Sequence, residues 1–508
     1  MQRAGGKPAA GGHRPTLVHN AGMLLALLAA PTILVAPFAV HGDGIGWAGV
    51  AVAESVTDVV VQANRENFIT MKQLDAVLRR RDLKLDEAAV PPRANEVARA
   101  LGATDLIVGD VTVQGDGFAL EARRVRLKDG VVLVTAREEG TRAQLPVLAQ
   151  KLGRAVLADT GTLGPMTRSV QALELATRCE LGLVRQQLGA RARVSLTPEQ
   201  AAQAEKDCRA ALKADPALGL AHAGLAVALA VRGKLPQARK EAQAASSARF
   251  VPLASLADAF AAHQLHDTAA ARGVLHDAVE ERPGFLHALG YMAEDHIDKG
   301  EDKEALEVLD RYLARAPDHP WALGKKAREL ARLKQFDEAV EVSEKALGLD
   351  PGDPELLIET ASRYIDAGRD ARAEPLLQQA AHADPPRPLA LLRLGYLYFR
   401  GHKLKEARAA LDQCIVEARR DDETRTRGIA HTDLARIDAK QNKYAEAVEE
   451  LGKARKEGFN RLPCDEPELA RWKERPELAR TCAEAAAALS DEKSDESAVP
   501  VELSGPGG

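Results

Sequence analysis

The sequence predicts an α/β domain at the amino-terminal side, with a mixed sheet that ends in an antiparallel meander, and an all-α solenoid behind it. The first part rests on β-type apolar runs joined by Asp-Gly turns, which end near residue 160. The second rests on a small residue that recurs every 33 or 34 positions. A fixed period of this length is typical of one supersecondary unit stacked many times, because a single unit buries its apolar face only against its neighbours. The period is marked by seven alanines: Ala204, Ala238, Ala271, Ala305, Ala339, Ala373 and Ala407.

Length and composition favour a multi-domain chain. A chain of 508 residues is too long for one compact core, and an aromatic content of 4% fits short stacked helices that pack through Ala and Leu. The formal net charge of −5 gives no nucleic-acid footprint at the level of the whole chain. The five cysteines are scattered and odd in number, so they predict neither a zinc site nor a disulfide framework. A bridge between Cys179 and Cys208, which could face each other on paired helices, is left open.

The first 30 residues read as a targeting segment. Three basic residues and no acidic one precede an apolar run at 23–30 (MLLALLAA), which ends in small residues. This pattern is typical of a signal peptide and predicts a periplasmic or cell-envelope location. An uncleaved membrane anchor and a start that is merely buried are the alternatives, since the apolar stretch continues to Val40.

Residues 31–160 are predicted to form one α/β unit. Alternating runs on both sides of the turns at 115–117 (GDG) and 128–130 (KDG) are hairpin signals. The expected order is a strand at 32–40, a helix at 47–63, a short strand at 68–71, helices at 72–81 and 95–101, strands at 105–114, 118–127 and 131–136, and a helix at 142–158.

A glycine motif lies between the first strand and the first helix of this unit. Gly44, Gly46 and Gly49 match G-x-G-x-x-G, the context in which a dinucleotide phosphate binds a helix N-terminus. The second strand is followed by Lys72, where the ribose hydroxyls would need an acid, and only one βαβ unit precedes the meander. We therefore interpret Gly44–Gly49 as a connector and predict no cofactor; a nucleotide-binding enzyme is a distant alternative.

The same domain resembles a known family. The segments 35–38 (VAPF), 47–57 (WAGVAVAESVT) and 99–109 (RALGATDLIVG), with a meander that contains an Asp-Gly turn, are similar to the TolB amino-terminal-like and CsgG-like group. The resemblance covers residues 31–158. It implies a binding or assembly module of bacterial envelope and signalling proteins that commonly precedes repeat arrays and carries no catalytic residue.

Residues 166–461 are predicted to form the repeat array. Proline recurs 12 positions after several of the alanines, where it cannot continue a helix, and small residues at fixed offsets let two helices cross closely. This pattern is identified as the tetratricopeptide repeat. Residues 462–489 are predicted to be a helical cap, and residues 490–508 a disordered acidic tail. A degenerate first unit is followed by seven units at 219–251, 252–285, 286–319, 320–353, 354–387, 388–427 and 428–461.

The repeat register nominates a peptide-binding patch. In tetratricopeptide proteins the first helix of each hairpin lines the concave face, and the register places Ile358, Ile365, Leu392, Tyr396 and Phe399 there. Exposed together, they would form an apolar recognition surface. The alternative is a slightly different rotation of the helices that buries them. The paired Lys and Asn pattern that captures an acidic carboxy-terminus is not present at these positions.

No residue pattern indicates chemistry. His263, His266 and His276 lie close in sequence, but they lack the i, i+4 spacing of a helical metal site. The sequence therefore predicts no catalytic residue, no metal and no cofactor. It predicts a non-catalytic scaffold of the bacterial cell envelope that binds protein or peptide partners, and no nucleic acid. A membrane-tethered cytoplasmic signalling adaptor with the same architecture is the alternative.

Overall fold

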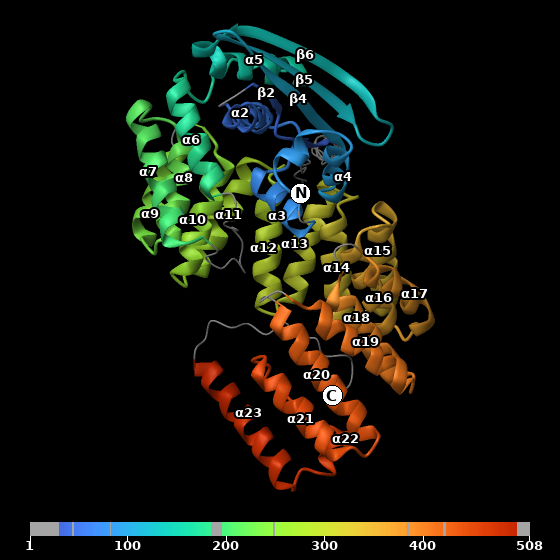
Figure 1. Cartoon of the computed structure of the whole chain (residues 1–508). Helices are drawn as coiled ribbons and strands as arrows, with labels where there is room; N and C mark the ends of the chain where they lie inside the picture. Colours follow the sequence, from blue (N-terminus) through green and yellow to red (C-terminus); the bar gives the residue numbers. More distant parts are fainter. Residues whose placement is uncertain are drawn as a thin grey trace, which may run out of the picture.

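The computed structural model describes residues 30–42, 45–81, 83–183, 196–246, 249–383, 386–419 and 423–494. The predicted signal segment up to residue 29 and the tail from residue 495 lie outside these ranges. Within them, the chain forms a six-stranded mixed sheet followed by a curved array of helical hairpins (Figure 1).

The sheet has the strand order β3-β1-β4-β5-β6, and β2 also pairs with β4. The pairs β1–β3, β1–β4 and β2–β4 are parallel, and β4–β5–β6 is an antiparallel meander. The Asp-Gly turns predicted between alternating runs are the two hairpin connections of this meander. The strands are β1 (Thr32–Val35), β2 (Ala39–His41), β3 (Asn67–Phe68), β4 (Asp105–Gln114), β5 (Gly117–Arg126) and β6 (Val131–Thr141).

The strand predicted at 32–40 is interrupted. Ile33 pairs with Asp105 and Ala39 with Asp110, so six positions on one strand face five on the other. The additional residue lies at 36–38, where Pro37 has no N–H to donate to the ladder. The Phe38 N–H turns away from β4 and donates to the Gly49 carbonyl in the following helix.

Helices cover both faces of the parallel part of the sheet. Ile33 and Val35 contact the core shared with α2 and α5, whereas Leu34 between them contacts the core shared with α3 and α4, as the alternation of strand side chains requires. These helices are α2 (Trp47–Ala63), α3 (Met71–Arg80), α4 (Arg93–Ala100) and α5 (Leu145–Leu157), with 3-10 turns at Asp86–Ala89 and Arg142–Gln144.

The array consists of consecutive antiparallel hairpins. All seven alanines that mark the period are at most 2% exposed, because each lies where a second helix crosses its neighbours. The helices are α6 (Val170–Leu183), α7 (Pro198–Ala214), α8 (Gly219–Val231), α9 (Leu235–Ala245), α10 (Pro252–Gln264), α11 (Thr268–Glu281), α12 (Leu286–Asp298), α13 (Asp302–Arg315), α14 (Pro320–Arg332), α15 (Phe336–Leu349), α16 (Pro354–Asp366), α17 (Asp370–Ala381), α18 (Pro388–Arg400), α19 (Leu404–Glu417), α20 (Thr424–Lys440) and α21 (Tyr444–Lys456).

Two further helices follow the last hairpin. The short α22 (Pro467–Ala470) precedes α23 (Pro476–Ser494), which continues past the predicted boundary at 489. Leu469 and Leu478 are fully buried against α20 and α21, so these helices cover the open end of the array.

Two disulfides tie the array, which corrects the expectation that the cysteines form no framework. Cys179–Cys208 joins α6 to α7, and a Cβ added at Gly224 of α8 would lie 2.8 Å from the Cys208 sulfur, so the bridge packs tightly against the next unit. Cys464–Cys482 joins the segment before α22 to α23. Cys414 is a buried free thiol.

Candidate functional site

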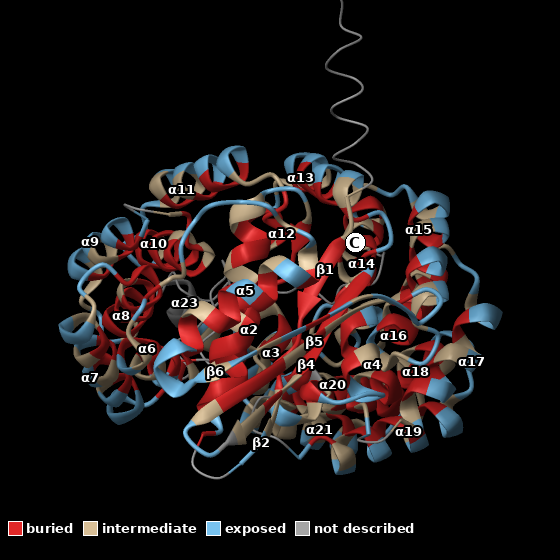
Figure 2. Ribbon diagram, turned by 90° about the horizontal axis from the view of Figure 1, so that it is seen from above, coloured by how far each residue is buried: buried red, intermediate tan, exposed pale blue. Residues whose placement is uncertain are grey.

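The concave side of the array holds the chain's own α/β domain. Seen from above, the first helices of the hairpins line the inside of the curve and the second helices lie outside (Figure 2). Strands β4 to β6 lie across the top of the array, and α3 and α4 lie between them and its inner helices (Figure 1). Phe68 of β3 stacks on Phe285, which precedes α12, with ring centroids 5.4 Å apart. A single parallel bridge pairs the same two residues, and the Phe68 N–H donates to the Gly284 carbonyl at 3.3 Å. The array therefore covers the outer edge of the sheet.

Polar contacts extend this docking along the curve. Arg81, just after α3, donates to Asp350 and Asp353 at 2.8 and 2.9 Å. Burial by itself would lower the pKa of the Arg81 guanidinium, but the bonds to the two carboxylates raise it above its ordinary value. The Asn67 side-chain amide donates to the Arg315 carbonyl at 3.0 Å. These contacts run from the end of α13 to the start of α16.

The predicted peptide patch is buried for the most part. Ile358, Ile365, Leu392 and Phe399 are 3–5% exposed, and only Tyr396 keeps a partly exposed side chain. The expected exposure of this cluster is therefore wrong for four of its five residues. The rotation of α16 and α18 turns these four into the cores between helices, as the alternative interpretation holds. Peptide binding by these residues stays a prediction.

Phe399 is covered by cations. The Lys440 ammonium lies 4.0 Å from its ring centroid and the Arg436 guanidinium 4.8 Å, both from α20. Cations at such distances are attracted to the ring face and screen it from solvent.

Charged and polar side chains lie together on the first helices of the last units. We call them the charged cluster, which consists of Arg363, Arg393, Tyr396 and Asp433; the first three are half-buried and Asp433 is buried. Arg363 and Asp433 are each in an ion pair within their own helix. The Arg393 Nε is buried without a hydrogen-bond partner in the part of the chain that the structure describes. Burial, followed by repulsion from Arg363, lowers the pKa of the Arg393 guanidinium.

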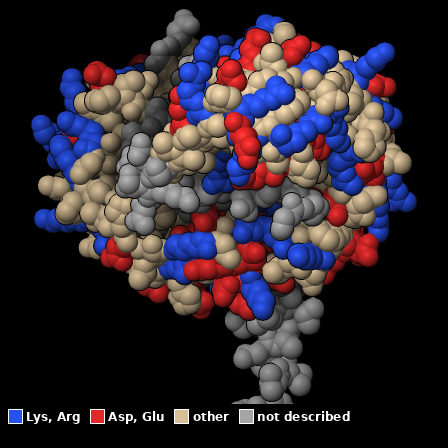
Figure 3. All heavy atoms as spheres, turned by 90° about the horizontal axis from the view of Figure 1, so that it is seen from below, with Lys and Arg blue, Asp and Glu red and all other residues tan. Residues whose placement is uncertain are grey.

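The lower face of the molecule carries no large field of one sign. Figure 3 shows Lys and Arg interspersed with Asp and Glu over this face. A partner that binds there would be selected by the local pattern of charges rather than attracted over long distances.

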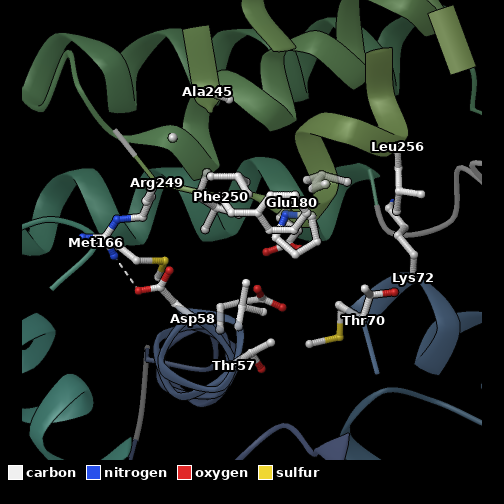
Figure 4. A pocket seen from close by; sticks show the side chains of 18 of the residues that line it. Thr57, Asp58, Thr70, Lys72, Met166, Glu180, Ala245, Arg249, Phe250 and Leu256 are labelled. Carbon is white, nitrogen blue, oxygen red and sulfur yellow. Dashed lines mark hydrogen bonds and ion pairs between the residues drawn. The ribbon is translucent and has the colours of Figure 1, made fainter. Parts of the chain in front are cut away.

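A cavity of about 210 Å³ lies where the α/β domain meets the first units of the array. It is enclosed by α2 and α3 on one side and by α6, α8, α10 and the segment before α10 on the other (Figure 4). Its apolar wall includes Val61, Met71, Met166, Leu220, Phe250, Leu253 and Leu256. Its charged wall is formed by Glu54, Asp58, Lys72, Glu180 and Arg249.

One pair in this wall is internally compensated. Asp58 of α2 accepts from Arg249 of the array, with 2.5 Å between Oδ2 and Nη1 (Figure 4). Asp58 also accepts from the Gln62 amide at 3.1 Å. Arg249 donates to the carbonyls of Gly164 and Pro165 as well. Burial raises the pKa of Asp58 although Arg249 opposes the shift.

The remaining charges of the wall are two acids and a base. Glu180 is 5% exposed, and its Oε2 has no hydrogen-bond partner among the described residues. Burial raises the pKa of Glu180 to about 7 although Lys72 opposes the shift. Burial likewise lowers the pKa of Lys72 to about 8, and its ammonium donates to the Leu183 carbonyl. Burial, and then the charges of Glu180 and Asp58, raise the pKa of Glu54 well above its ordinary value.

Sequence reasoning missed this site. One signal was available: Glu54 and Asp58, four residues apart, are the only charges in the largely apolar helix that begins at Trp47. Acids on a buried helix face need partners, because an unpaired buried charge is costly. Glu180 lies in a helix of ordinary composition, and nothing local marks it.

The glycine motif has a packing explanation. A Cβ at Gly49 would lie 2.2 Å from the Phe38 carbonyl oxygen, so α2 approaches the strand too closely for any side chain there. A Cβ at Gly46 would meet nothing within 4 Å. Gly44 lies outside the described residues. Only one of the three glycines thus has an observed steric requirement, and it is met by the chain itself.

In the described ranges, no three His, Cys, Asp or Glu side chains are grouped so as to hold a metal ion. No described helix combines the length and the apolar character that a membrane span requires.

Comparison with known proteins identifies the repeats. The tetratricopeptide repeat family matches residues 262–328 and 330–386. These residues, from the end of α10 through α17, therefore carry tetratricopeptide repeats. The sequence matches no curated protein.

Several solved structures are similar to parts of the chain. A tetratricopeptide repeat protein from Parabacteroides merdae is 14% identical, with 62% of this chain and 99% of that one covered and a TM-score of 0.38. PilW, a type IV pilus biogenesis factor, is 20% identical over 42% of this chain and 94% of its own, with a TM-score of 0.34. MamA from Desulfovibrio magneticus is 19% identical over 35% and 96%, with a TM-score of 0.29. These scores are too low to carry a functional argument.

Proposed function

We propose that the protein is a non-catalytic protein-interaction scaffold that binds its partner at the charged cluster. The repeats matched over 262–386 belong to a class of surface that presents preorganised helices to proteins or peptides. Contacts of the α/β domain lie on the hairpins from α13 to the start of α16, and we place the partner on the first helices α16, α18 and α20.

The observation that carries this proposal is the pairing of Arg393 with Tyr396 one turn further along α18. Arg393 lies among other charges of the first helices and has an Nε without a hydrogen-bond partner among the described residues. Leaving such a donor unsatisfied costs about 1–3 kcal/mol, and a carboxylate or carbonyl of a partner would recover that energy. Tyr396 beside it offers a partly exposed ring.

The experiment is crosslinking in intact cells followed by identification of the captured partner, with one double variant and one control variant. The double variant Arg393→Ala, Tyr396→Ala removes the proposed contacts. Lys405→Ala, an exposed cation on the outer helix α19, is the matched control. We expect the double variant to capture at least about tenfold less partner, as for the loss of one interface hot spot. Its melting temperature should be unchanged, and the control should capture as much partner as the wild type. Unchanged capture by the double variant would show that the partner binds elsewhere.

For location, we propose the cell envelope, with the membrane-tethered cytoplasmic adaptor as the alternative. Two disulfides among the described residues favour an oxidising compartment, and the basic and apolar leader agrees with export. We also propose that the α/β domain is a TolB/CsgG-like assembly module, for which the mixed sheet with its meander is the support. Amino-terminal sequencing of the native protein, together with mass spectrometry without reduction, tests the location. A start near Pro31 and two bridges support export, whereas an intact Met1 and free thiols support the adaptor.

A further inference from the structure

Among the described residues that line it, the cavity between the α/β domain and the array has one more acid than it has bases. Asp58 is neutralised by Arg249 at 2.5 Å. Glu54 and Glu180 then share the ammonium of Lys72. Glu180, which is 5% exposed, is one of the residues that line the cavity, and its Oε2 has no hydrogen-bond partner among the described residues. A buried carboxylate in this position is stabilised only by a proton or by a cation.

Apolar residues of the array supply a surface for the rest of a ligand. Phe250, Leu253 and Leu256 line the cavity, and Phe250 lies beside Glu180 with Asp58 on the side of α2 (Figure 4). A dry apolar cavity of about 150 Å³ binds benzene, so 210 Å³ holds a ligand of similar or slightly larger size. Drug-sized ligands occupy pockets of about 300 Å³ or more, and the cavity is too small for them.

We propose that this cavity binds a small organic cation, with an ammonium group held by Glu180 and Glu54 and an apolar chain packed against Phe250, Leu253 and Leu256. An anion does not fit, because both cations of the wall already have oxygen partners. The cavity shares no lining residue with the charged cluster, so the proposal does not depend on the partner-binding function. The cavity lies between α2 and α3 of the α/β domain and α6 and α10 of the array. A ligand bound in it therefore also links the α/β domain to the array.

The test is calorimetry on the full chain at pH 8 with three probes that share one chain length. The probes are n-pentylammonium, which has as many non-hydrogen atoms as benzene, n-pentanol without a charge, and n-pentanoate with the opposite charge. We expect saturable binding of the ammonium, weaker binding of the alcohol and none of the carboxylate. Glu180→Gln keeps the shape of the side chain and removes the charge. It should lower the affinity for n-pentylammonium at least about tenfold. Glu174→Gln, on the same helix and paired with Arg178 away from the cavity, should have no effect.

A second readout does not depend on the variants. Binding of a cation stabilises ionised Glu180, so the wild-type protein should release protons on binding at pH 7. The release is measured by repeating the titration in two buffers of different ionisation enthalpy. Equal affinity for the ammonium and the alcohol, no proton release, or no saturable binding of the ammonium would each overturn the proposal. If Glu180→Gln does not fold, Glu54→Gln, on a partly exposed acid, takes its place.

Discussion

Replacing Phe285 by alanine should uncouple the sheet from the array. The Phe285 side chain is fully buried, stacks on Phe68 at 5.4 Å and meets the Phe250 ring edge-on at 5.6 Å. Burial of a phenylalanine side chain contributes about 1.5–3 kcal/mol, and each aromatic pair adds about 0.5–1.5 kcal/mol. With the cavity that truncation leaves, we expect Phe285→Ala to lower the free energy of unfolding by about 3–5 kcal/mol.

The assay is urea unfolding of the full chain, followed by circular dichroism and by tryptophan fluorescence. Trp47 reports on the α/β domain, and Trp321 and Trp472 report on the array. If Phe285 couples the two parts, the unfolding transitions followed by circular dichroism and by fluorescence should coincide in the wild type and separate in the variant. Leu265→Ala, at a side chain that is 44% exposed, is the control and should change stability by less than about 0.5 kcal/mol. A loss below about 1 kcal/mol for Phe285→Ala, on the scale of a surface substitution, would refute the reasoning.

Three further predictions concern single features. Serine at both Cys179 and Cys208 should cost about 3 kcal/mol in unfolding free energy, since the bridge closes a 29-residue separation; an unchanged melting temperature would contradict this. Gly49→Ala should destabilise the α/β domain by about 1–3 kcal/mol, because the added Cβ clashes with the preceding strand. Gly46→Ala, whose Cβ would meet nothing within 4 Å, should be tolerated in the same melting assay. Equal effects of the two substitutions would contradict the packing explanation. The pKa of Glu180 is raised by burial to about 7 from 4.5, so the stability that its protonated form contributes is complete below pH 4.5 and is lost as the pH rises through 7. Wild-type stability should therefore fall relative to Glu180→Gln over that window in urea titrations, and parallel curves would contradict the shift.

Local patterns predicted the elements of the fold well. The strand at 105–114 has the predicted bounds, and the helix at 47–63 does as well. Both follow from periodicity and from turns next to them in sequence, which depend on nearby residues alone. The period of the alanines likewise set the register of the hairpins, because each unit repeats the same crossing.

Long-range features escaped prediction for a physical reason. The period of a repeat does not fix the rotation of each helix about its own axis, and a change of one position turns a side chain by about 100°. This rotation decided that Ile358 is buried and Tyr396 is not. The docking of the α/β domain depends on residues such as Arg81, whose local sequence is that of any solvated basic segment. The bridge between Cys464 and Cys482 likewise depends on how the last helix folds back.

The covered sheet edge has a consequence for the order in which the chain folds. Strand β3 is complete once Phe68 has been synthesised, but the residue that covers it, Phe285, follows 217 positions later. At ribosomal rates of about 5–20 residues per second, that gap corresponds to about 10–40 s. During that interval the nascent chain presents a strand edge that can pair with another molecule. Assembly of the first hairpins thus covers the β3 edge and ends the period in which the nascent chain can aggregate through it. A chaperone would act on this protein during that period.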